Sequence, residues 1–269
     1  MNRYMNTPGI LPALILPVVM ATTPQVGLAG DDEDENPFEV SEIFFELNNT
    51  DGDLGIHALI DGDAWKRLKI MDHDENMLLN IKVRGHLKQQ GLTEIFFESA
   101  EPPFESDDPD EVALSPEEFF ERFPAGIYEI KGLTLEGEEL GSETEITHVM
   151  PAPPVVTVND LAVAENCDAE LPVVSSGAPV TISWEPVIHS HPEIGIPGEL
   201  VDVVNYEVVV EIDETPYHTS TVLPNTTTTF EVPDEILALG SEIKFEVLVR
   251  EASFNQTAIE SCFCIDACD

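Results

Sequence analysis

Apolar runs of about strand length recur between residues 38 and 150, separated by short clusters of Gly, Asp, Asn and Pro. Such runs predict β-strands. In MLLNIKV, Leu79 and Ile81 fall on one face of an extended strand and Asn80 and Lys82 on the other, because successive side chains alternate. The predicted strands are 42–47, 55–60, 65–71, 77–83, 93–98, 127–135 and 144–150. Seven strands in this span predict a β-sandwich or barrel.

One segment of this region has the pattern of a short helix. In SPEEFFERFPAG, Ser115 suits the N-cap, Pro116 the first helical position, and Glu118 completes a capping box. Gly126 lies beyond the expected end. The sequence therefore predicts a single helix among the strands.

The pentapeptide EIFFE occurs twice, at 42–46 and at 94–98. Two copies are compatible with an internal duplication. Five residues are too few to establish one.

A proline-rich segment follows the predicted strands. PAPPVV, at 151–156, contains three prolines, which favour extended geometry and make a semi-rigid spacer. We therefore expect a first β-sandwich or barrel domain at 38–150, a hinge at 151–154 and a second domain at 155–269.

The second domain resembles a fibronectin type III module, which is an immunoglobulin-like sandwich. The resemblance rests on PVTISWEPV (179–187) and VVNYEVVVEI (203–212), and on the segment TTTFEVPDEILALGSEIKFEVLVREAS that starts at 227. It implies that Trp184 is the buried tryptophan of strand B and that Tyr206 lies in strand C. The position of the family's tyrosine corner falls near Ile243, which has no hydroxyl, so packing alone is expected to hold that corner.

The whole chain is thus expected to be all-β, with two sandwich-like domains in tandem. A β domain followed by such a module is similar to a group of secreted bacterial proteins with a terminal fibronectin type III domain. This resemblance implies no activity, because such sandwiches host many functions.

The first 29 residues have the pattern of a secretory signal peptide. One Arg precedes an apolar run of about a dozen residues, which is interrupted by Pro12 and Pro17 and followed by small residues. We expect cleavage after Ala29, an acidic leader at 30–37 and a secreted product. No later stretch is apolar enough to span a membrane, so we expect no membrane insertion.

The charge is extreme, with 53 acidic and 11 basic residues and a net charge of −42. Without the signal peptide, 10 basic residues against 53 acidic ones give −43. Nucleic acid and anionic membranes are excluded as partners, since both require a broad basic face. Self-repulsion of this size requires screening salt or bound cations, so we expect calcium to stabilise the fold.

The stretch NNTDGDLGIHALIDGDAW suggests where calcium binds. An Asn and two Asp stand at alternate positions, as at positions 1, 3 and 5 of an EF-hand loop, but Leu54 and Ile60 occupy positions 6 and 12. Asp-Gly pairs are also the usual signal for tight turns. The sequence therefore predicts a turn at each end of strand 55–60, and either turn is a candidate ion site. The candidate ligands are Asn49, Asp51, Asp53, Asp61 and Asp63.

Four cysteines in a secreted chain predict two disulfides. The type III resemblance implies that the loop after strand A, with Cys167, meets the end of strand G, with Cys262, Cys264 and Cys268. The partner of Cys167 stays open at this point. A zinc site is the alternative, although no CxxC pair is present. His189 and His191 are a second zinc alternative, for which no third ligand is evident.

Basic residues cluster in one short segment. Only three acids oppose six bases between 65 and 91, which gives a local charge near +3. The six are Lys66, Arg67, Lys69, Lys82, Arg84 and Lys88. We expect nearby acidic loops to balance them. The alternative is a docking patch for a second copy of the chain or for an acidic polysaccharide.

No GxSxG, HExxH, P-loop or dinucleotide motif is present. We therefore predict a secreted, non-enzymatic structural or adhesive module of the cell surface or extracellular matrix. The alternative function is a polysaccharide-processing hydrolase or an accessory carbohydrate-binding protein that uses the acidic first domain.

Overall fold

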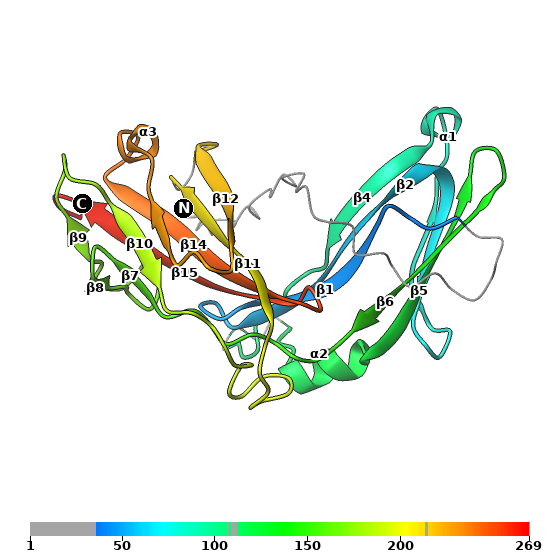
Figure 1. Cartoon of the computed structure of the whole chain (residues 1–269), viewed down its shortest axis with the longest axis horizontal. Helices are drawn as coiled ribbons and strands as arrows, with labels where there is room; N and C mark the ends of the chain where they lie inside the picture. Colours follow the sequence, from blue (N-terminus) through cyan, green and yellow to red (C-terminus); the bar gives the residue numbers. More distant parts are fainter. Residues whose placement is uncertain (1–35, 107, 109–111, 213–214, 269) are drawn as a thin grey trace, which may run out of the picture.

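The computed structural model describes residues 36–106, 108, 112–212 and 215–268. Within them the chain forms fifteen strands and three short helices, so the all-β prediction is confirmed. The expected signal peptide and most of the acidic leader lie outside the described residues. Figure 1 shows two sheet-built units arranged as a wide V that meet at its centre.

The first unit has six strands where seven were predicted. They are β1 (Val40–Asn48), β2 (Asp53–Met71), β3 (Met77–Lys82), β4 (Leu92–Glu98), β5 (Gly126–Thr134) and β6 (Glu139–Ile146). β1 and β5 pair along one edge of the long strand β2, and β4 and β3 pair along the other. β6 then pairs with β5 and ends the sheet, which stays open. The long strand therefore positions nearly every other strand of the unit.

One of the two predicted Asp-Gly turns is present and the other is not. Asp51-Gly52 turns between β1 and β2, with a hydrogen bond of 2.9 Å from the Gly52 amide to the Asn48 carbonyl. The prediction of a turn at 61–63 is wrong, because β2 runs straight through it. The register of β2 against β4 shifts between Asp61 and Trp65, so the Asp-Gly pair marks a bulge.

The predicted helix is confirmed as α2 (Pro116–Arg122), with its capping box formed. The Glu118 amide donates to Ser115 Oγ at 3.3 Å, and the Ser115 amide donates to Glu118 Oε2 at 3.2 Å. The helix buries Phe119 edge-on against Phe45 of β1, with ring centroids 5.2 Å apart. It therefore covers the core of the first unit.

The second unit is a two-sheet sandwich. One sheet has the order β13-β10-β7-β8 and the other includes β12-β11-β14-β15, with β9 on β15. Their bounds are β7 (Val156–Val158), β8 (Leu161–Ala162), β9 (Val173–Val174), β10 (Thr181–Trp184), β11 (Val203–Glu211), β12 (His218–Pro224), β13 (Thr229–Glu231), β14 (Glu242–Glu251) and β15 (Gln256–Ile265). Two further short helices are α1 (Leu87–Gln90), in the first unit, and α3 (Asp234–Leu237). The prediction of a single helix in the first unit is therefore wrong, because α1 adds a second. Read as strands A to G, this order matches the arrangement that the type III resemblance implied.

The expected core residues of the sandwich are in place. Trp184 lies in β10 and Tyr206 in β11, with ring centroids 5.3 Å apart. The Tyr206 hydroxyl accepts a hydrogen bond from the Val187 amide at 2.9 Å. Ile243 is fully buried, so packing holds the corner where the family has its tyrosine.

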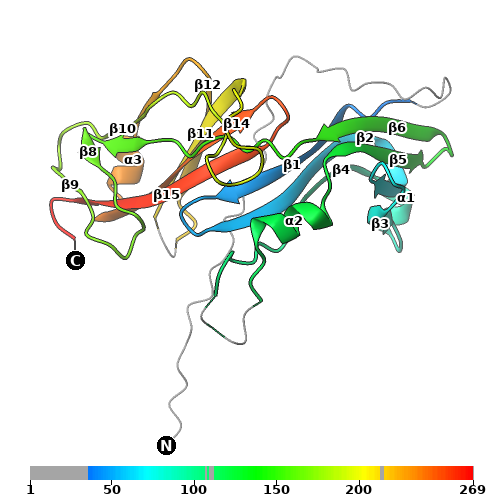
Figure 2. The ribbon, with the colours of Figure 1, turned by 90° about the horizontal axis from the view of Figure 1, so that it is seen from below.

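A parallel strand pair joins the two units into one sheet. β1 pairs with β15, with Glu46, Leu47 and Asn48 opposite Gln256, Thr257 and Ala258. The sheet therefore runs without interruption from β12 to β6 (Figures 1 and 2). Each unit still has its own hydrophobic cluster, and the division into two domains stays a prediction.

The proline-containing segment at 151–154 is packed at this junction, where we had expected a spacer. The Pro151 carbonyl accepts a hydrogen bond from Thr257 Oγ1 at 2.7 Å. The Ala152 amide donates to the His189 carbonyl at 2.9 Å. Both neighbours belong to the second unit, so the first two residues of the segment are held against it.

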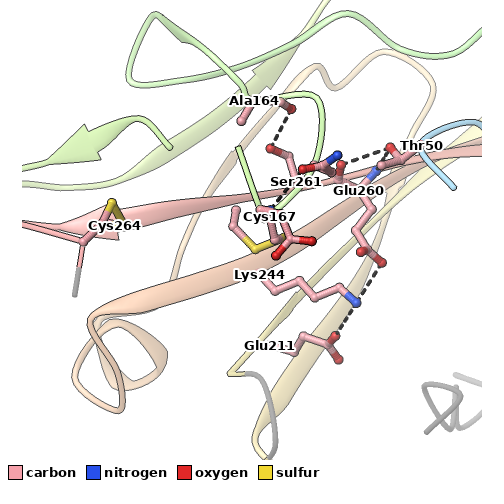
Figure 3. Close-up of a disulfide and its surroundings, with 12 residues drawn as sticks. Thr50, Ala164, Cys167, Glu211, Lys244, Glu260, Ser261 and Cys264 are labelled. Carbon is pink, nitrogen blue, oxygen red and sulfur yellow. Dashed lines mark hydrogen bonds and ion pairs between the residues drawn. A yellow bond between two sulfur atoms is a disulfide. The ribbon is translucent and has the colours of Figure 1, made fainter. Parts of the chain in front are cut away.

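Both predicted disulfides form. Cys167 pairs with Cys262 and Cys264 with Cys268. The first bond ties the loop after β8 to β15, where Ser261 Oγ also donates to the Ala164 carbonyl at 3.0 Å (Figure 3). Because all four cysteines are bonded, a thiolate zinc site is ruled out in this state.

Candidate functional site

The predicted calcium ligands do not form one group. Asp61 lies eight residues from Asp53 on the same strand, about 26 Å away, so the two cannot share an ion. The Asn49 side chain is also engaged elsewhere, since its Oδ1 accepts a hydrogen bond from His191 Nε2 at 3.0 Å. Asp51 and Asp53 remain on the turn itself, while Asp63 is exposed on β2.

The loop histidines do not form a zinc pair. His191 is buried, and its Nδ1 accepts from the amides of Glu193 and Ile194 at 3.1 and 2.9 Å. The proton must therefore be on Nε2, which donates to Asn49. His189 is exposed. His191 thus fastens the second unit's loop to the β1–β2 turn.

The six clustered cations lie on β2, on β3, on the segment between β3 and α1, and on α1 itself. Arg67 is directly opposite Lys82 in the β2–β3 pair, and Lys69 is opposite Lys131 in the β2–β5 pair. Like charges opposite each other destabilise a sheet. The fold nevertheless concentrates them on these strands.

Within the described residues, no carboxylate is within ion-pair distance of these six cations. By contrast, Lys131, Lys244 and Arg250 have carboxylate partners at 2.6 to 3.4 Å. Residues 107 and 109–111, which include further acids, lie outside the described residues, so the expected balance by nearby acidic loops stays a prediction.

Four of the six cations line a hollow of about 220 Å³. It is lined by Lys66, Arg67, Lys82, Val83, Lys88 and Leu133. Lys66 Nζ donates to the Leu135 carbonyl at 3.3 Å, which fixes one wall. We call the six cations with this hollow the basic patch. Its dimensions and charge suit an anionic group of a small or linear ligand.

A second cluster, which the sequence did not reveal, lies on the outer face of β2. Asp53, Gly55 and His57 share this face. Across β1, Glu46 is opposite Gly55, and across β4, Glu98 is opposite His57. Glu101 reaches back over Gly55, where an added Cβ would lie 2.1 Å from its Oε1. Glycine is therefore required for this carboxylate to lie over the strand.

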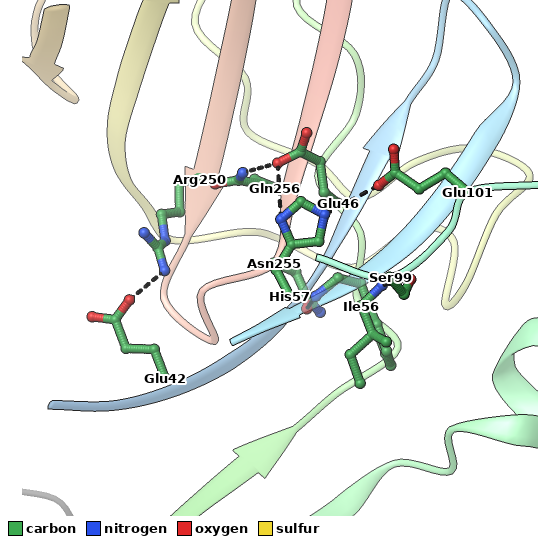
Figure 4. Close-up of polar contacts among 10 residues, drawn as sticks. Glu42, Glu46, Ile56, His57, Ser99, Glu101, Arg250, Asn255 and Gln256 are labelled. Atoms are coloured by element: carbon green, nitrogen blue, oxygen red, sulfur yellow. Dashed lines mark hydrogen bonds and ion pairs between the residues drawn. The ribbon is translucent and has the colours of Figure 1, made fainter. Parts of the chain in front are cut away.

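The His57 imidazole is held on four sides. Its Nε2 is 3.1 Å from Glu101 Oε1 and its Nδ1 is 3.7 Å from Glu46 Oε2 (Figure 4). The rings of Phe44 and Phe96 flank it at 5.3 and 5.9 Å. Only 2% of His57 is exposed, so its orientation is fixed by these contacts.

Burial dominates the electrostatics of this cluster, and the neighbouring acids add to its effect on the carboxylates. Burial, and then the charge of Glu101, raises the pKa of Asp53 to about 7. Burial also raises the pKa of Glu46, although His57 opposes the shift. For His57, burial lowers the pKa, but the hydrogen bond to Glu101 and the charge of Glu46 outweigh it and leave the pKa raised. Asp53 Oδ1 is buried without a hydrogen-bond partner.

A signal for this cluster was present in the sequence. Glu46 and Glu98 are the last residues of the two EIFFE copies, and the two copies flank β2 on opposite edges. Strand alternation alone places Asp53, Gly55 and His57 on one face. The pairing of both copies with the same strand was the missing step.

No protein-family model matches the chain, and no curated protein matches its sequence. Solved structures with some likeness include a 1.5-MDa bacterial ice-binding adhesin (14% identity, TM-score 0.25, 87% of this chain and 67% of that one). A two-domain fibronectin type III segment of chicken tenascin has 10% identity and a TM-score of 0.28 over 86% of this chain and 99% of that one. The human OSCAR ligand-binding domain has 12% identity and a TM-score of 0.24 over 83% and 98%.

These superpositions are too poor to carry an argument, so the fold assignment rests on the strand order described above. Among the described residues, no helix has the length and apolar character needed to cross a membrane.

Proposed function

We propose that the chain is a secreted, non-enzymatic structural or adhesive module that attaches to an acidic extracellular polysaccharide through the basic patch. The single observation that carries this proposal is the set of cations without carboxylate partners among the described residues of a chain with a net charge of −42. Two disulfides support an oxidising compartment outside the cell.

A linear polyanion suits the patch better than a second copy of the chain. At physiological salt, charges more than about 8 Å apart are largely screened, so the local patch governs contact. A thin polysaccharide reaches the hollow without bringing further protein carboxylates near the acidic surface. A second copy brings its own 53 acids. We therefore commit to a polysaccharide that carries carboxylate or sulfate groups.

The shared sheet suits a structural role. It fixes the basic patch on one arm of the V relative to the disulfide-bonded sandwich on the other. A force on the bound polysaccharide is therefore transmitted from one unit to the other through paired strands. No flexible linker has to carry this force between the units.

Calcium stabilisation is the second part of the proposal. Asp51 is exposed on the β1–β2 turn, and the carboxylate of Asp53 has an oxygen without a partner. A calcium ion at this turn relieves repulsion among neighbouring acids, with other ligands supplied by water. Asp61 and Asp63, farther along β2, are a separate acidic pair on the same strand.

The test is binding of alginate, with neutral dextran as the control ligand. We expect alginate binding to weaken as NaCl rises from about 50 to about 300 mM, and dextran not to bind. Substitution of Lys66, Lys69, Lys82 and Arg84 by Ser is expected to weaken binding at least about tenfold.

A matched pair of single variants controls for overall charge. Arg67→Ser removes an exposed cation from the patch, and Arg122→Ser removes an exposed cation from α2. We expect Arg67→Ser to lose roughly two- to fivefold in affinity and Arg122→Ser to bind as the parent does. Equal affinities of all these proteins for alginate contradict the proposal. A different outcome assigns the patch to a second copy of the chain: the parent does not bind alginate but self-associates as its concentration rises, and the variant with four Ser substitutions does not self-associate.

A further inference from the structure

We propose that His57, Glu98 and Glu101 bind one divalent transition-metal ion of the zinc class on the outer face of β2. This site is separate from the basic patch and does not depend on polysaccharide binding. One donor atom from each of the three residues lies within 4.8 Å of the others. The group combines a strand pair, since His57 and Glu98 are directly opposite, with a side chain that returns from the following loop.

The spacing of the donors is close to that of a bound ion. Zinc–nitrogen and zinc–oxygen bonds of about 2.0–2.2 Å in a tetrahedron place donor atoms about 3.3 Å apart. His57 Nε2 and Glu101 Oε1 are 3.1 Å apart. Glu98 is exposed at the strand edge, so its side chain completes the set by rotation, without movement of the backbone. Water fills the fourth position.

The donor set favours zinc over calcium. Calcium prefers six to eight oxygen ligands, whereas an imidazole with two carboxylates suits zinc and its neighbours among the transition metals. All four cysteines form disulfides and do not compete for the ion. The described site therefore supplies one nitrogen and at least two oxygens.

The second layer of contacts is built to orient the imidazole. Glu46 faces Nδ1, which is the usual place of a carboxylate behind a metal-bound histidine. Glu46 is itself held by a hydrogen bond from the Gln256 side chain, on the strand that joins the two units. With Nδ1 engaged by Glu46, Nε2 is the nitrogen that faces Glu101 and the ion.

The local charge also favours a cation. Three carboxylates, those of Glu46, Glu98 and Glu101, lie around one imidazole, and Asp53 lies near Glu46 and Glu101 on the same face of β2. The guanidinium of Arg250 does not offset them, because it pairs with Glu42 at 2.6 Å and lies 4.5 Å over the Phe44 ring.

A protonated His57 is the competing explanation, since an imidazolium between carboxylates satisfies the same contacts. Proton and metal compete for Nε2, so the two explanations differ in one observable. Only the metal site predicts saturable binding of Zn²⁺, because a histidine must release its proton to ligate a metal ion.

The experiment is calorimetric titration of Zn²⁺ into the chelator-treated, untagged secreted chain. We expect one equivalent to bind, and Co²⁺ to give the visible absorption of a four- or five-coordinate ion. Glu98→Gln and Glu101→Gln are expected to weaken binding at least about tenfold. Glu94→Gln is the matched control, because Glu94 is exposed on the same strand and opens the same EIFFE copy. It is expected to bind as the parent does.

His57→Gln is expected to abolish binding, and its far-ultraviolet circular dichroism reports whether the sheet survives. The exposed Glu98 gives a result that does not depend on that outcome. Absence of saturable Zn²⁺ binding, or equal affinity of the Glu98→Gln and Glu94→Gln proteins, overturns the site. Binding that survives in His57→Gln but is lost in His189→Gln assigns the ion to the exposed loop and overturns it as well.

Discussion

Asn255 joins the two units through several buried hydrogen bonds. It lies in the turn between β14 and β15 and is 1% exposed. Its Oδ1 accepts from the Phe45 amide of β1 at 2.9 Å, and its Nδ2 donates to the carbonyls of Thr147 and Val149, each at 3.0 Å. One side chain thus joins the second unit to β1 and to the segment that follows β6.

Replacement of Asn255 by Ala leaves one buried amide and two carbonyls without these partners. Each unsatisfied buried group costs about 1–3 kcal/mol, and the carbonyls recover part of this through water that enters the space. We therefore expect a loss of about 3 kcal/mol in the free energy of unfolding. For a chain of this size, that corresponds to a fall of about 6–12 °C in Tm. Asn166→Ala, at an exposed loop, is the control and is expected to cost less than about 0.5 kcal/mol.

The two tryptophans allow the assay to report on each unit. Trp65 is buried in the core of the first unit and Trp184 in that of the second. In urea titrations of Trp65→Phe and Trp184→Phe proteins, the remaining tryptophan reports one unit at a time. We expect Asn255→Ala to lower both midpoints together, each relative to its own parent. A loss below about 0.5 kcal/mol, or a shift of the Trp184 signal alone, refutes the reasoning that the shared sheet couples the units.

Three further predictions concern the disulfide bonds, the pH dependence of stability and the effect of calcium. Replacement of Cys167 and Cys262 by Ser is expected to lower the free energy of unfolding by about 4–5 kcal/mol, and replacement of Cys264 and Cys268 by about 2 kcal/mol. The first loss is larger because that disulfide closes a loop of 95 residues, whereas the second closes one of 4. Equal losses in denaturant titrations contradict this prediction. The folded-state pKa of Asp53, raised to about 7, means that the folded chain binds more protons than the unfolded chain between pH about 4 and 7. The free energy of unfolding, measured in the presence of chelator, should therefore fall as pH rises through that window. Asp53→Asn should remove about 2 kcal/mol of this fall after allowance for solvent screening, whereas the control Asp63→Asn should leave the fall unchanged. An identical pH slope in both variants contradicts the attribution of the fall to Asp53. Millimolar calcium is expected to raise Tm more than sodium chloride of equal ionic strength, and no difference between the two salts in thermal melts removes calcium from the account.

The features that sequence predicted well are those that local physics decides. Ser115, Pro116 and Glu118 start a helix through contacts within one turn. The buried residues of β14 alternate as a sandwich strand requires, and Trp184 and Tyr206 occupy their expected strands. The cysteines pair because the type III arrangement brings their segments to one end of the sandwich.

The features that the sequence did not predict depend on which strands pair with each other. β2 continues through Gly62 because it changes partners there, and an added Cβ would lie 2.9 Å from the ring of Phe38. The β1–β15 pair joins Glu46 to Gln256, 210 residues away, and no local pattern announces it. The cluster around His57 follows from two other pairings, since the register of β4 and of β1 against β2 brings its members together.

The central claim is that the basic patch binds an acidic polysaccharide. Lysine acetylation with and without alginate oligomers tests this claim most directly, with the extent of acetylation at each lysine measured by mass spectrometry. Lys244 is the internal reference, because it is held between Glu211 and Glu260 at 3.4 and 2.8 Å. The account predicts that alginate slows acetylation of Lys66, Lys82 and Lys88, which line the hollow, and leaves Lys244 unchanged. Equal rates with and without alginate at the three hollow lysines would contradict it.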